Sequence, residues 1–267
     1  MLPDFEMVVH QIPTTEDITI VPIFDVHLGA QECREQDFIA FVNTIAESKN
    51  TYAIIGGDLL DNGTRNGITN IFRATMPPSA QKREMAKILE PIRDKILCSV
   101  SGNHERRSGK DADDDPIYDI MAKLDIEDRH RENMVFLKVQ LGKQEFDSGV
   151  RTNSKYRPSY TFCVMHGAGG GALPGGVINR NERMGYAIDG LDALIVGHSH
   201  KPMLSQPGKI VVDNRNNTVS VVPFKVITAT AWLDYGDYAM QKMLLPSSHA
   251  MQTIHLSAYR KEMVVTM

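Results

Sequence analysis

The sequence predicts an α/β fold, and three observations support this. Segments with strand and helix character alternate through the first two thirds of the 267-residue chain. Short β-branched segments separated by turns follow His200. Hydrophobic residues make up 42% and charged residues 23% of the chain, as in an ordinary globular protein. Because no repeat, low-complexity tract or linker divides the sequence, we expect one domain over residues 1–267.

The first part of the chain contains the alternating elements. Residues 18–24 are apolar and β-branched, which predicts a buried strand. Residues 36–48 have helical spacing, with Phe38, Val42 and Ile45 on one face. Further strands are expected at residues 52–55, 96–100, 160–165 and 193–196, and helices at residues 78–95 and 116–124.

After His200 the pattern predicts mostly antiparallel strands, at residues 209–213, 218–222 and 225–230 and within 251–265. Residues 213–217, with the sequence DNRNN, are typical of a hairpin turn. These late strands complete a second sheet or pair across a subunit interface. The sequence leaves both alternatives open, together with the oligomeric state.

Charge and cysteine content limit the classes of function. The net charge of −4 does not point to nucleic acid, although a small basic rim on an acidic protein is compatible with it. Cys33, Cys98 and Cys163 are widely spaced and odd in number, which favours reduced thiols. The sequence begins without a signal-peptide pattern and lacks an apolar run of the ~20 residues that a membrane span needs. We therefore expect a cytoplasmic protein without a membrane partner.

Five polar clusters each follow a predicted strand, where α/β sheets place their ligand-binding loops. They are D-V-H at residues 25–27, G-D-L-L-D at 57–61, G-N-H-E at 102–105, H-G at 166–167 and G-H-S-H at 197–200.

These clusters offer carboxylate, imidazole and amide ligands but no thiolate. The candidate metal ligands are Asp25, His27, Asp58, Asn103, His166, His198 and His200. Such a set suits Mn, Fe or Zn rather than a structural zinc site, and Mn²⁺ is our first choice. Seven ligands exceed the needs of one four-coordinate ion. They suit two ions about 3.5–4 Å apart, a recurrent arrangement for phosphate chemistry.

The ordered set of five motifs resembles the calcineurin-like metallophosphoesterase superfamily and spans residues 25–200, about two thirds of the chain. The resemblance implies a sandwich of two mixed β-sheets flanked by α-helices. It also implies one metal held by Asp25, His27, Asp58 and His200, and a second held by Asp58, Asn103, His166 and His198, with Asp58 bridging.

The resemblance further implies that His104 is catalytic rather than a ligand. It would contact the phosphate and protonate the leaving oxygen, while Asp61 hydrogen-bonds its imidazole and favours the charged form. Glu105 is expected to be structural. The resulting hypothesis is a dinuclear phosphoesterase in which a metal-bridging hydroxide attacks phosphorus in line, without a covalent intermediate.

The substrate is less defined than the reaction. Ser/Thr protein phosphatases of the superfamily carry arginine after the second Asp of G-D-x-x-D, whereas this sequence has Asn62. The chain looks more like compact bacterial and phage phosphodiesterases and nucleases. We favour a phosphodiester substrate, nucleic acid or nucleotide. The alternative is a phosphomonoesterase acting on a phosphoprotein or small metabolite, and an inert scaffold ranks last.

Two further segments have both a structural and a functional interpretation. The glycine-rich residues 167–176 are a flexible loop or a phosphate-binding loop, and we favour the former. Arg106, Arg107 and Lys110 precede four aspartates within residues 111–115, so a solvated charged loop is favoured over a phosphate-binding patch.

Overall fold

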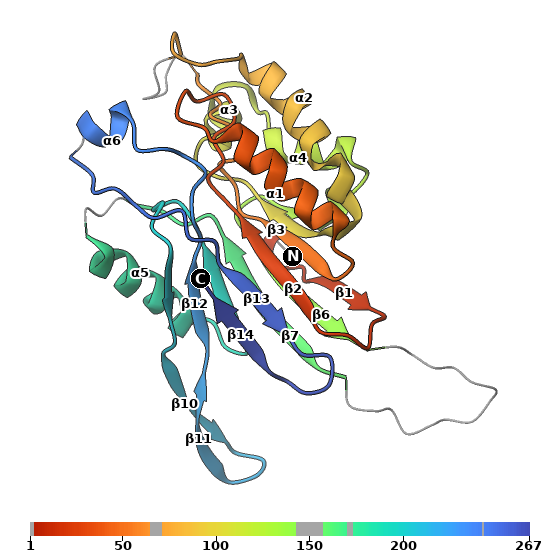
Figure 1. The fold of residues 1–267 in the computed structure, drawn as a ribbon. Helices are drawn as coiled ribbons and strands as arrows, with labels where there is room; N and C mark the ends of the chain where they lie inside the picture. Colours follow the sequence, from red (N-terminus) through yellow and green to blue (C-terminus); the bar gives the residue numbers. More distant parts are fainter. Residues whose placement is uncertain (1–2, 65–70, 143–156, 170–172, 242) are drawn as a thin grey trace, which may run out of the picture.

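The computed structural model describes residues 3–64, 71–142, 157–169, 173–241 and 243–267. Within these ranges, two six-stranded sheets lie face to face, with helices on their outer faces (Figure 1). Both sheets mix parallel and antiparallel pairs, which confirms the predicted sandwich.

The first sheet has the order β14-β13-β2-β3-β4-β5. Its four strands from β2 to β5 are parallel, and the two late strands pair antiparallel at one edge. Its strands are β2 (Ile18–Ile23), β3 (Thr51–Ile55), β4 (Ile96–Val100), β5 (His130–Arg131), β13 (Thr253–Leu256) and β14 (Met263–Thr266).

The second sheet has the order β1-β6-β7-β8-β12-β9. Strands β7, β8 and β12 form its parallel centre, so the carboxyl ends of β7 and β8 lie at one edge. Its strands are β1 (Val8–Ile12), β6 (Met134–Leu141), β7 (Ser159–Met165), β8 (Ala193–Val196), β9 (Met203–Ser205) and β12 (Lys225–Thr228).

The helices cover the outer faces of the two sheets. Helices α1, α2 and α4 pack on the first sheet, and α5 packs on the second. Bounds are α1 (Glu35–Glu47), α2 (Pro78–Leu89), α3 (Glu105–Ala112), α4 (Pro116–Lys123), α5 (Pro174–Ala187) and α6 (Asp237–Gln241), with 3₁₀ turns η1 (Pro3–Phe5), η2 (Glu90–Lys95) and η3 (Glu127–Arg129). None of the described helices combines the length and apolar character needed to cross a bilayer.

The core follows from the alternation of side chains along β2. Ile20 faces the second sheet and joins the cluster of Phe162 and Ile195, whereas Val21 and Ile23 face the helices. Because β2 is buried on both faces, its sequence is apolar except at Thr19, as expected for a central strand with parallel pairing.

Three predicted boundaries were wrong. The helix expected over residues 78–95 ends at Leu89 and continues as η2, because Pro91 lacks the N–H that an α-helix needs. The charged segment after G-N-H-E is the helix α3, not a loop; its only buried residue is Glu105, so it has no apolar stripe. Helix α5 begins at Pro174, which is favourable at the first helical position, and Gly175 and Gly176 belong to that helix rather than to the glycine loop.

The late strands divide between two arrangements. Strands β12, β13 and β14 complete the two sheets, whereas β10 (Gly208–Asp213) and β11 (Thr218–Pro223) form a separate hairpin that projects from the sandwich (Figure 1). The turn expected at residues 213–217 lies at its tip, where Asp213 accepts hydrogen bonds from the backbone N–H groups of Arg215 and Asn216. Residues 170–172 of the glycine-rich segment lie outside the described residues.

Candidate metal centre

The candidate ligands lie at the carboxyl ends of five strands, three in the first sheet and two in the second. Because the sheets are stacked, loops distant in sequence meet at one edge of the sandwich. Asp25 and His27 follow β2, Asp58 follows β3, Asn103 and His104 follow β4, His166 follows β7, and His198 and His200 follow β8.

The loops that carry the ligands have an unusual backbone conformation. Five candidate ligands have φ between 50° and 65°, in the left-handed region: Asp25, His27, Asp58, His198 and His200. Non-glycine residues adopt this region at a cost, and such strained residues cluster at functional sites. Hydrogen bonds between loops hold the conformation; the N–H of His27 donates to the carbonyl of Asp58 at 2.9 Å.

Two motif glycines permit close approach between the loops. A Cβ atom on Gly102 would lie 2.1 Å from Oδ1 of Asp58, and one on Gly197 would lie 2.8 Å from Oδ2 of Asp25. Glycine is therefore required at both positions for the carboxylates to reach the centre.

Asp25, His27 and His200 form the first ligand group. Oδ1 of Asp25 lies 3.6 Å from Nε2 of His200 and 4.0 Å from Nε2 of His27, and the two imidazole nitrogens are 3.3 Å apart. The other carboxylate oxygen of Asp25 accepts the backbone N–H of His198 at 2.8 Å. This hydrogen bond leaves Oδ1 directed at the two imidazoles.

Asp58, His166 and His198 form the second group, and Asn103 lies against it. Nε2 of His166 is 3.2 Å from Oδ2 of Asp58 and 3.0 Å from Oδ1 of Asn103. Nδ1 of His198 is 2.7 Å from the same Asn103 oxygen. The carbonyl of Gly56, 2.9 Å from Nδ1 of His166, fixes that ring with Nε2 toward the group.

Asp58 lies between the two groups. Its Oδ2 is 3.2 Å from Nε2 of His166, 3.8 Å from Nε2 of His27 and 4.0 Å from Nε2 of His104. Its Oδ1 accepts the backbone N–H of His104 at 2.8 Å, which orients the carboxylate. One oxygen of Asp58 is thus within 4 Å of imidazoles from both groups.

This donor set fits divalent metal ions. Carboxylate, imidazole and amide ligands bound at ~2.0–2.2 Å lie roughly 3–3.5 Å from one another, close to the spacings found here. Oδ1 of Asp25 is fully buried and has no hydrogen-bond partner among the described residues. A buried charged oxygen without a partner is costly unless a cation compensates it.

The charges of the cluster are strongly coupled. Burial lowers the pKa of His27 well below its ordinary value, and the neighbouring His104 adds to this, so the imidazole is neutral, as a candidate metal ligand must be. Burial opposes protonation of His166 as well, but the Asp58 carboxylate, together with Asp25 and the Gly56 carbonyl, outweighs it and raises the pKa of His166 to about 9. The imidazoles, His166 above all, conversely hold the pKa of Asp58 well below its usual range despite burial.

His104 adjoins the cluster from the start of α3. Its Nδ1 lies 2.7 Å from the main-chain carbonyl of Asp61 and 3.6 Å from the Asp61 carboxylate. The ring is therefore held by Asp61, but chiefly through the backbone. Burial lowers the pKa of His104, and the carboxylates of Asp58 and Asp61 oppose that effect only in part.

Glu105 joins two of the ligand loops. Its buried carboxylate accepts the backbone N–H groups of Asp58, Leu60 and Gly102 at 2.9–3.0 Å. Burial, with Asp58 nearby, raises the pKa of Glu105 to about 7 although these donors act in the opposite direction.

The arginines near the centre make contacts with backbone carbonyls. Arg106 donates to the carbonyl of Glu132, and Arg107 lies 3.5 Å from that of Asp61. Arg180 of α5 donates to the carbonyls of Ala168 and Gly169, two and three residues after His166. These contacts brace the loops around the ligands.

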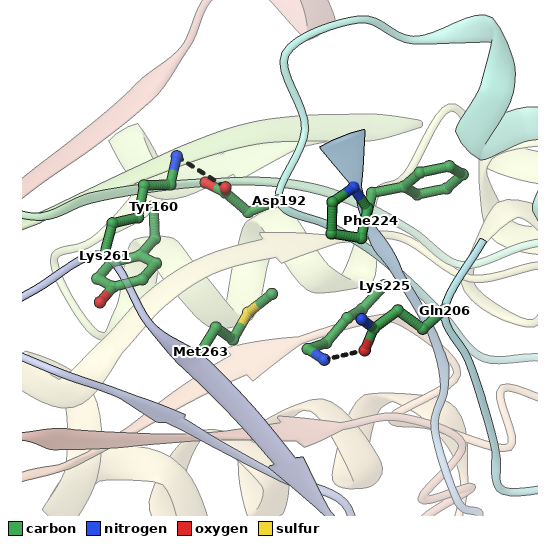
Figure 2. Close-up of a pocket in the computed structure, with 8 residues that line it drawn as sticks. Tyr160, Asp192, Gln206, Phe224, Lys225, Lys261 and Met263 are labelled. Carbon is green, nitrogen blue, oxygen red and sulfur yellow. Dashed lines mark hydrogen bonds and ion pairs between the residues drawn. The ribbon is translucent and has the colours of Figure 1, made fainter. Parts of the chain in front are cut away.

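A separate hollow of about 200 Å³ lies at the opposite ends of the same strands (Figure 2). Tyr160 near the start of β7 and Asp192 just before β8 line it, whereas the ligands follow the other ends of β7 and β8. Its lysines are engaged: Lys261 pairs with Asp192 at 2.7 Å, and Lys225 donates to Gln206 at 2.5 Å. This hollow is distinct from the candidate metal centre.

Sequence reasoning missed the polar support of α3. Asn62, Gln81 and Ser108 are linked by side-chain hydrogen bonds behind His104. Asn62 directly follows the G-D-x-x-D motif, but its position in the sequence gives no sign of a contact with α3. Gln81 belongs to no motif. A single polar residue in a helix is expected to be solvent-exposed, whereas the structure buries Gln81 completely.

Comparison with known proteins identifies a family. The sequence matches the model of the calcineurin-like phosphoesterases over residues 19–202. Among solved structures, it is similar to a conserved uncharacterized protein, a predicted phosphoesterase, from Streptococcus pneumoniae TIGR4. The identity is 10% and the TM-score 0.35, over 95% of this chain and 100% of that chain, so this likeness carries no argument. None of the curated proteins matches significantly. On the strength of the family model, which covers more than half of its length, the chain belongs to the calcineurin-like phosphoesterase family.

Proposed function

We propose that this chain is a phosphodiesterase that depends on two divalent metal ions. The observation that carries the proposal is the position of Asp58, whose Oδ2 lies within 4 Å of imidazoles in both ligand groups. One group would hold a metal through Asp25, His27, Asp58 and His200, and the other through Asp58, Asn103, His166 and His198. Manganese remains our first choice, with iron and zinc as alternatives.

When bound, two such ions activate water and offset charge on the phosphoryl oxygens. His104 supports the departure of the leaving oxygen. The Asp61 carbonyl only accepts hydrogen bonds, so it fixes the ring proton on Nδ1 and leaves Nε2 facing the ligand cluster. In the imidazolium form Nε2 would carry the second ring proton, and this is the proton that the leaving oxygen would receive. A phosphate anion beside the ring would raise the pKa of His104 and oppose the effect of burial.

Asn62 supports a diester rather than a monoester substrate. A phosphomonoester dianion carries an additional charge, which a cationic side chain at this position would offset. Asn62 is uncharged, is buried, and directs its amide to the carbonyl of His104 instead of the ligand cluster.

Parallel assays on bis-p-nitrophenyl phosphate and p-nitrophenyl phosphate in manganese test the substrate class. We expect a higher kcat/KM for the diester. A strong preference for the monoester would instead favour a phosphomonoesterase.

The variant His104→Asn tests the assigned role of the histidine. Loss of the proton donor should lower kcat by about 10²–10⁴-fold while the metal content per chain remains that of the wild type. Wild-type turnover in this variant would refute the assignment. Wild-type protein that is loaded with manganese yet inert toward every phosphoester would refute the proposed function itself.

A further inference from the structure

Asn62 lies beneath His104 and is committed to contacts inside the protein. It is 1% exposed and adopts a left-handed backbone conformation, with φ of 44°. Its Nδ2 donates to the carbonyl of His104 at 2.8 Å and to the hydroxyl of Ser108 at 2.8 Å. The Ser108 hydroxyl donates back to Oδ1 of Asn62 at 3.2 Å. Both ends of the Asn62 side chain are therefore bound to Ser108 of α3, and the amide also holds His104 at the N-cap of that helix.

Asn62 is itself anchored to α2. Its backbone N–H donates to Oε1 of Gln81 at 2.9 Å, and Gln81 is fully buried. Nε2 of Gln81 donates in turn to the carbonyl of Met76 at 2.9 Å. A continuous hydrogen-bonded chain thus runs from the start of α2 through Asn62 to His104.

His104 is consequently held at two points by adjacent residues. The Asp61 carbonyl lies against its ring, and the Asn62 amide holds its main-chain carbonyl. His104 occupies the N-cap position of α3, where no side-chain capping hydrogen bond forms. The Asn62 contact therefore helps to set where the backbone enters α3, and with it the direction of the ring.

We propose that Asn62 is a positioning residue that sets the His104 ring for protonation of the leaving oxygen. The inference rests on the proposed function, because it requires His104 to supply that proton. Removing the Asn62 amide would leave the metal ligands in place and let the His104 ring shift. A shift of about 1 Å at a reacting group can cost 10²-fold in rate. The loss should depend on the substrate, since only a basic leaving oxygen needs the proton.

The experiment compares Asn62→Ala and Asn62→Asp with wild type on two diesters. Nitrophenolate leaves bis-p-nitrophenyl phosphate readily without a proton, whereas the phenolate of diphenyl phosphate is a poorer leaving group. The aspartate is isosteric but cannot donate to His104. For both variants we expect kcat on diphenyl phosphate to fall about 10–100-fold further than kcat on bis-p-nitrophenyl phosphate. KM and metal content should be unchanged.

Two controls make the result specific. Asn181→Ala removes another buried amide, which donates to the hydroxyl of Thr228 at 3.2 Å. This variant should leave the ratio of the kcat values on the two diesters unchanged. His104→Asn should give the same selective loss, and more strongly than Asn62→Ala.

If folded, metal-loaded Asn62→Ala lost kcat equally on the two diesters, the inference would be overturned. Asn62 would then have a structural role only. If Asn62→Ala does not fold, Asn62→Asp carries the same comparison. Wild-type selectivity in the Asn62 variants beside a selective His104→Asn would overturn this inference alone. An unchanged His104→Asn would refute the proposed role of His104 instead.

Discussion

Glu105 illustrates how one residue can connect distant parts of the centre. Its carboxylate accepts three backbone N–H groups, two from the loop after β3 and one from the loop after β4. Donors that converge on a buried carboxylate offset the cost of removing it from water. Glu105 thereby fixes the spacing of the loops that carry Asp58 and Asn103. Its own carboxylate is occupied by backbone donors and is not one of the candidate metal ligands.

Replacing this carboxylate should destabilise the protein. In Glu105→Gln one oxygen becomes an NH₂ group, which cannot accept and faces backbone donors. We expect a loss of about 2–4 kcal/mol in the free energy of unfolding, measured by urea denaturation. The exposed Glu127→Gln is the control and should change stability by less than about 0.5 kcal/mol. Equal stability of Glu105→Gln and wild type would contradict the structural role.

At the scale of the elements, Asp115 secures the start of α4. Its Oδ1 accepts the backbone N–H groups of Ile117 and Tyr118, and its Oδ2 lies 3.0 Å from Nε2 of His130. Burial would raise the pKa of Asp115, but its hydrogen bonds to His130 and Ser101 outweigh burial and lower the pKa below its ordinary value. The ionised form is therefore favoured by folding.

This shift predicts a pH-dependent contribution to stability. Because the pKa is lower in the folded state than in the unfolded state, the contribution is present above the unfolded value of 3.8 and is lost as the pH falls through the folded value. Asp115→Asn keeps a capping oxygen but not the charge. Its stability deficit relative to wild type should be largest near pH 6 and should shrink below pH 3.8 in urea titrations.

Asp115→Ala provides the comparison for the cap itself. It removes the cap as well and should cost about 1 kcal/mol more than Asp115→Asn at both pH values. A deficit of Asp115→Asn that did not vary with pH would contradict the assigned ionisation.

The two kinds of β-element differ in how much they contribute to the core. Ile195 in β8 is fully buried between the sheets, whereas Ile210 in the β10–β11 hairpin is 76% exposed. Ile195→Ala should therefore cost about 2–5 kcal/mol, because it removes buried methyl groups and leaves a cavity. Ile210→Ala should change stability by less than about 0.5 kcal/mol. Thermal and urea unfolding of this matched pair tests the burial, and a comparable loss in both variants would contradict it.

For the molecule as a whole, the candidate metal centre connects the two sheets. Asp25 and Asp58 follow strands of the first sheet, and His166 and His198 follow strands of the second. An ion held by ligands from both sheets binds the folded state in preference to the unfolded chain. Metal binding should therefore oppose separation of the sheets.

We expect manganese to stabilise the fold by about 2.7 kcal/mol when its free concentration is 100 times the Kd. The Tm should rise with manganese concentration and fall on addition of a chelator, as measured by scanning calorimetry. Asp58→Asn should reduce this rise in Tm more than substitution of any other candidate ligand, since Asp58 adjoins both ligand groups. A wild-type Tm that did not respond to manganese would argue against binding at these residues.

The sequence by itself determined those helices and strands whose apolar side chains follow a regular pattern along the chain. Apolar and β-branched residues occupy nearly every position of strands β2, β4 and β8, so the sequence predicts these strands and the polar clusters that directly follow them. Strand β6 is absent from the sequence predictions, although Val135, Leu137, Val139 and Leu141 occupy its alternate, buried positions. Helix α3 could not be predicted from periodicity, because its contacts with the rest of the protein are polar and centre on Glu105.

Only the tertiary structure decided which polar residues meet. Asp25 and His200 are 175 positions apart in the chain, and their 3.6 Å contact depends on the stacking of two sheets. The same holds for the chain from Gln81 through Asn62 to His104, which exists because Asn62, in the loop after β3, contacts both α2 and the residue before α3. The local sequence pattern indicates which backbone geometry each segment prefers. Which side chains meet depends on how segments distant in the sequence pack against one another.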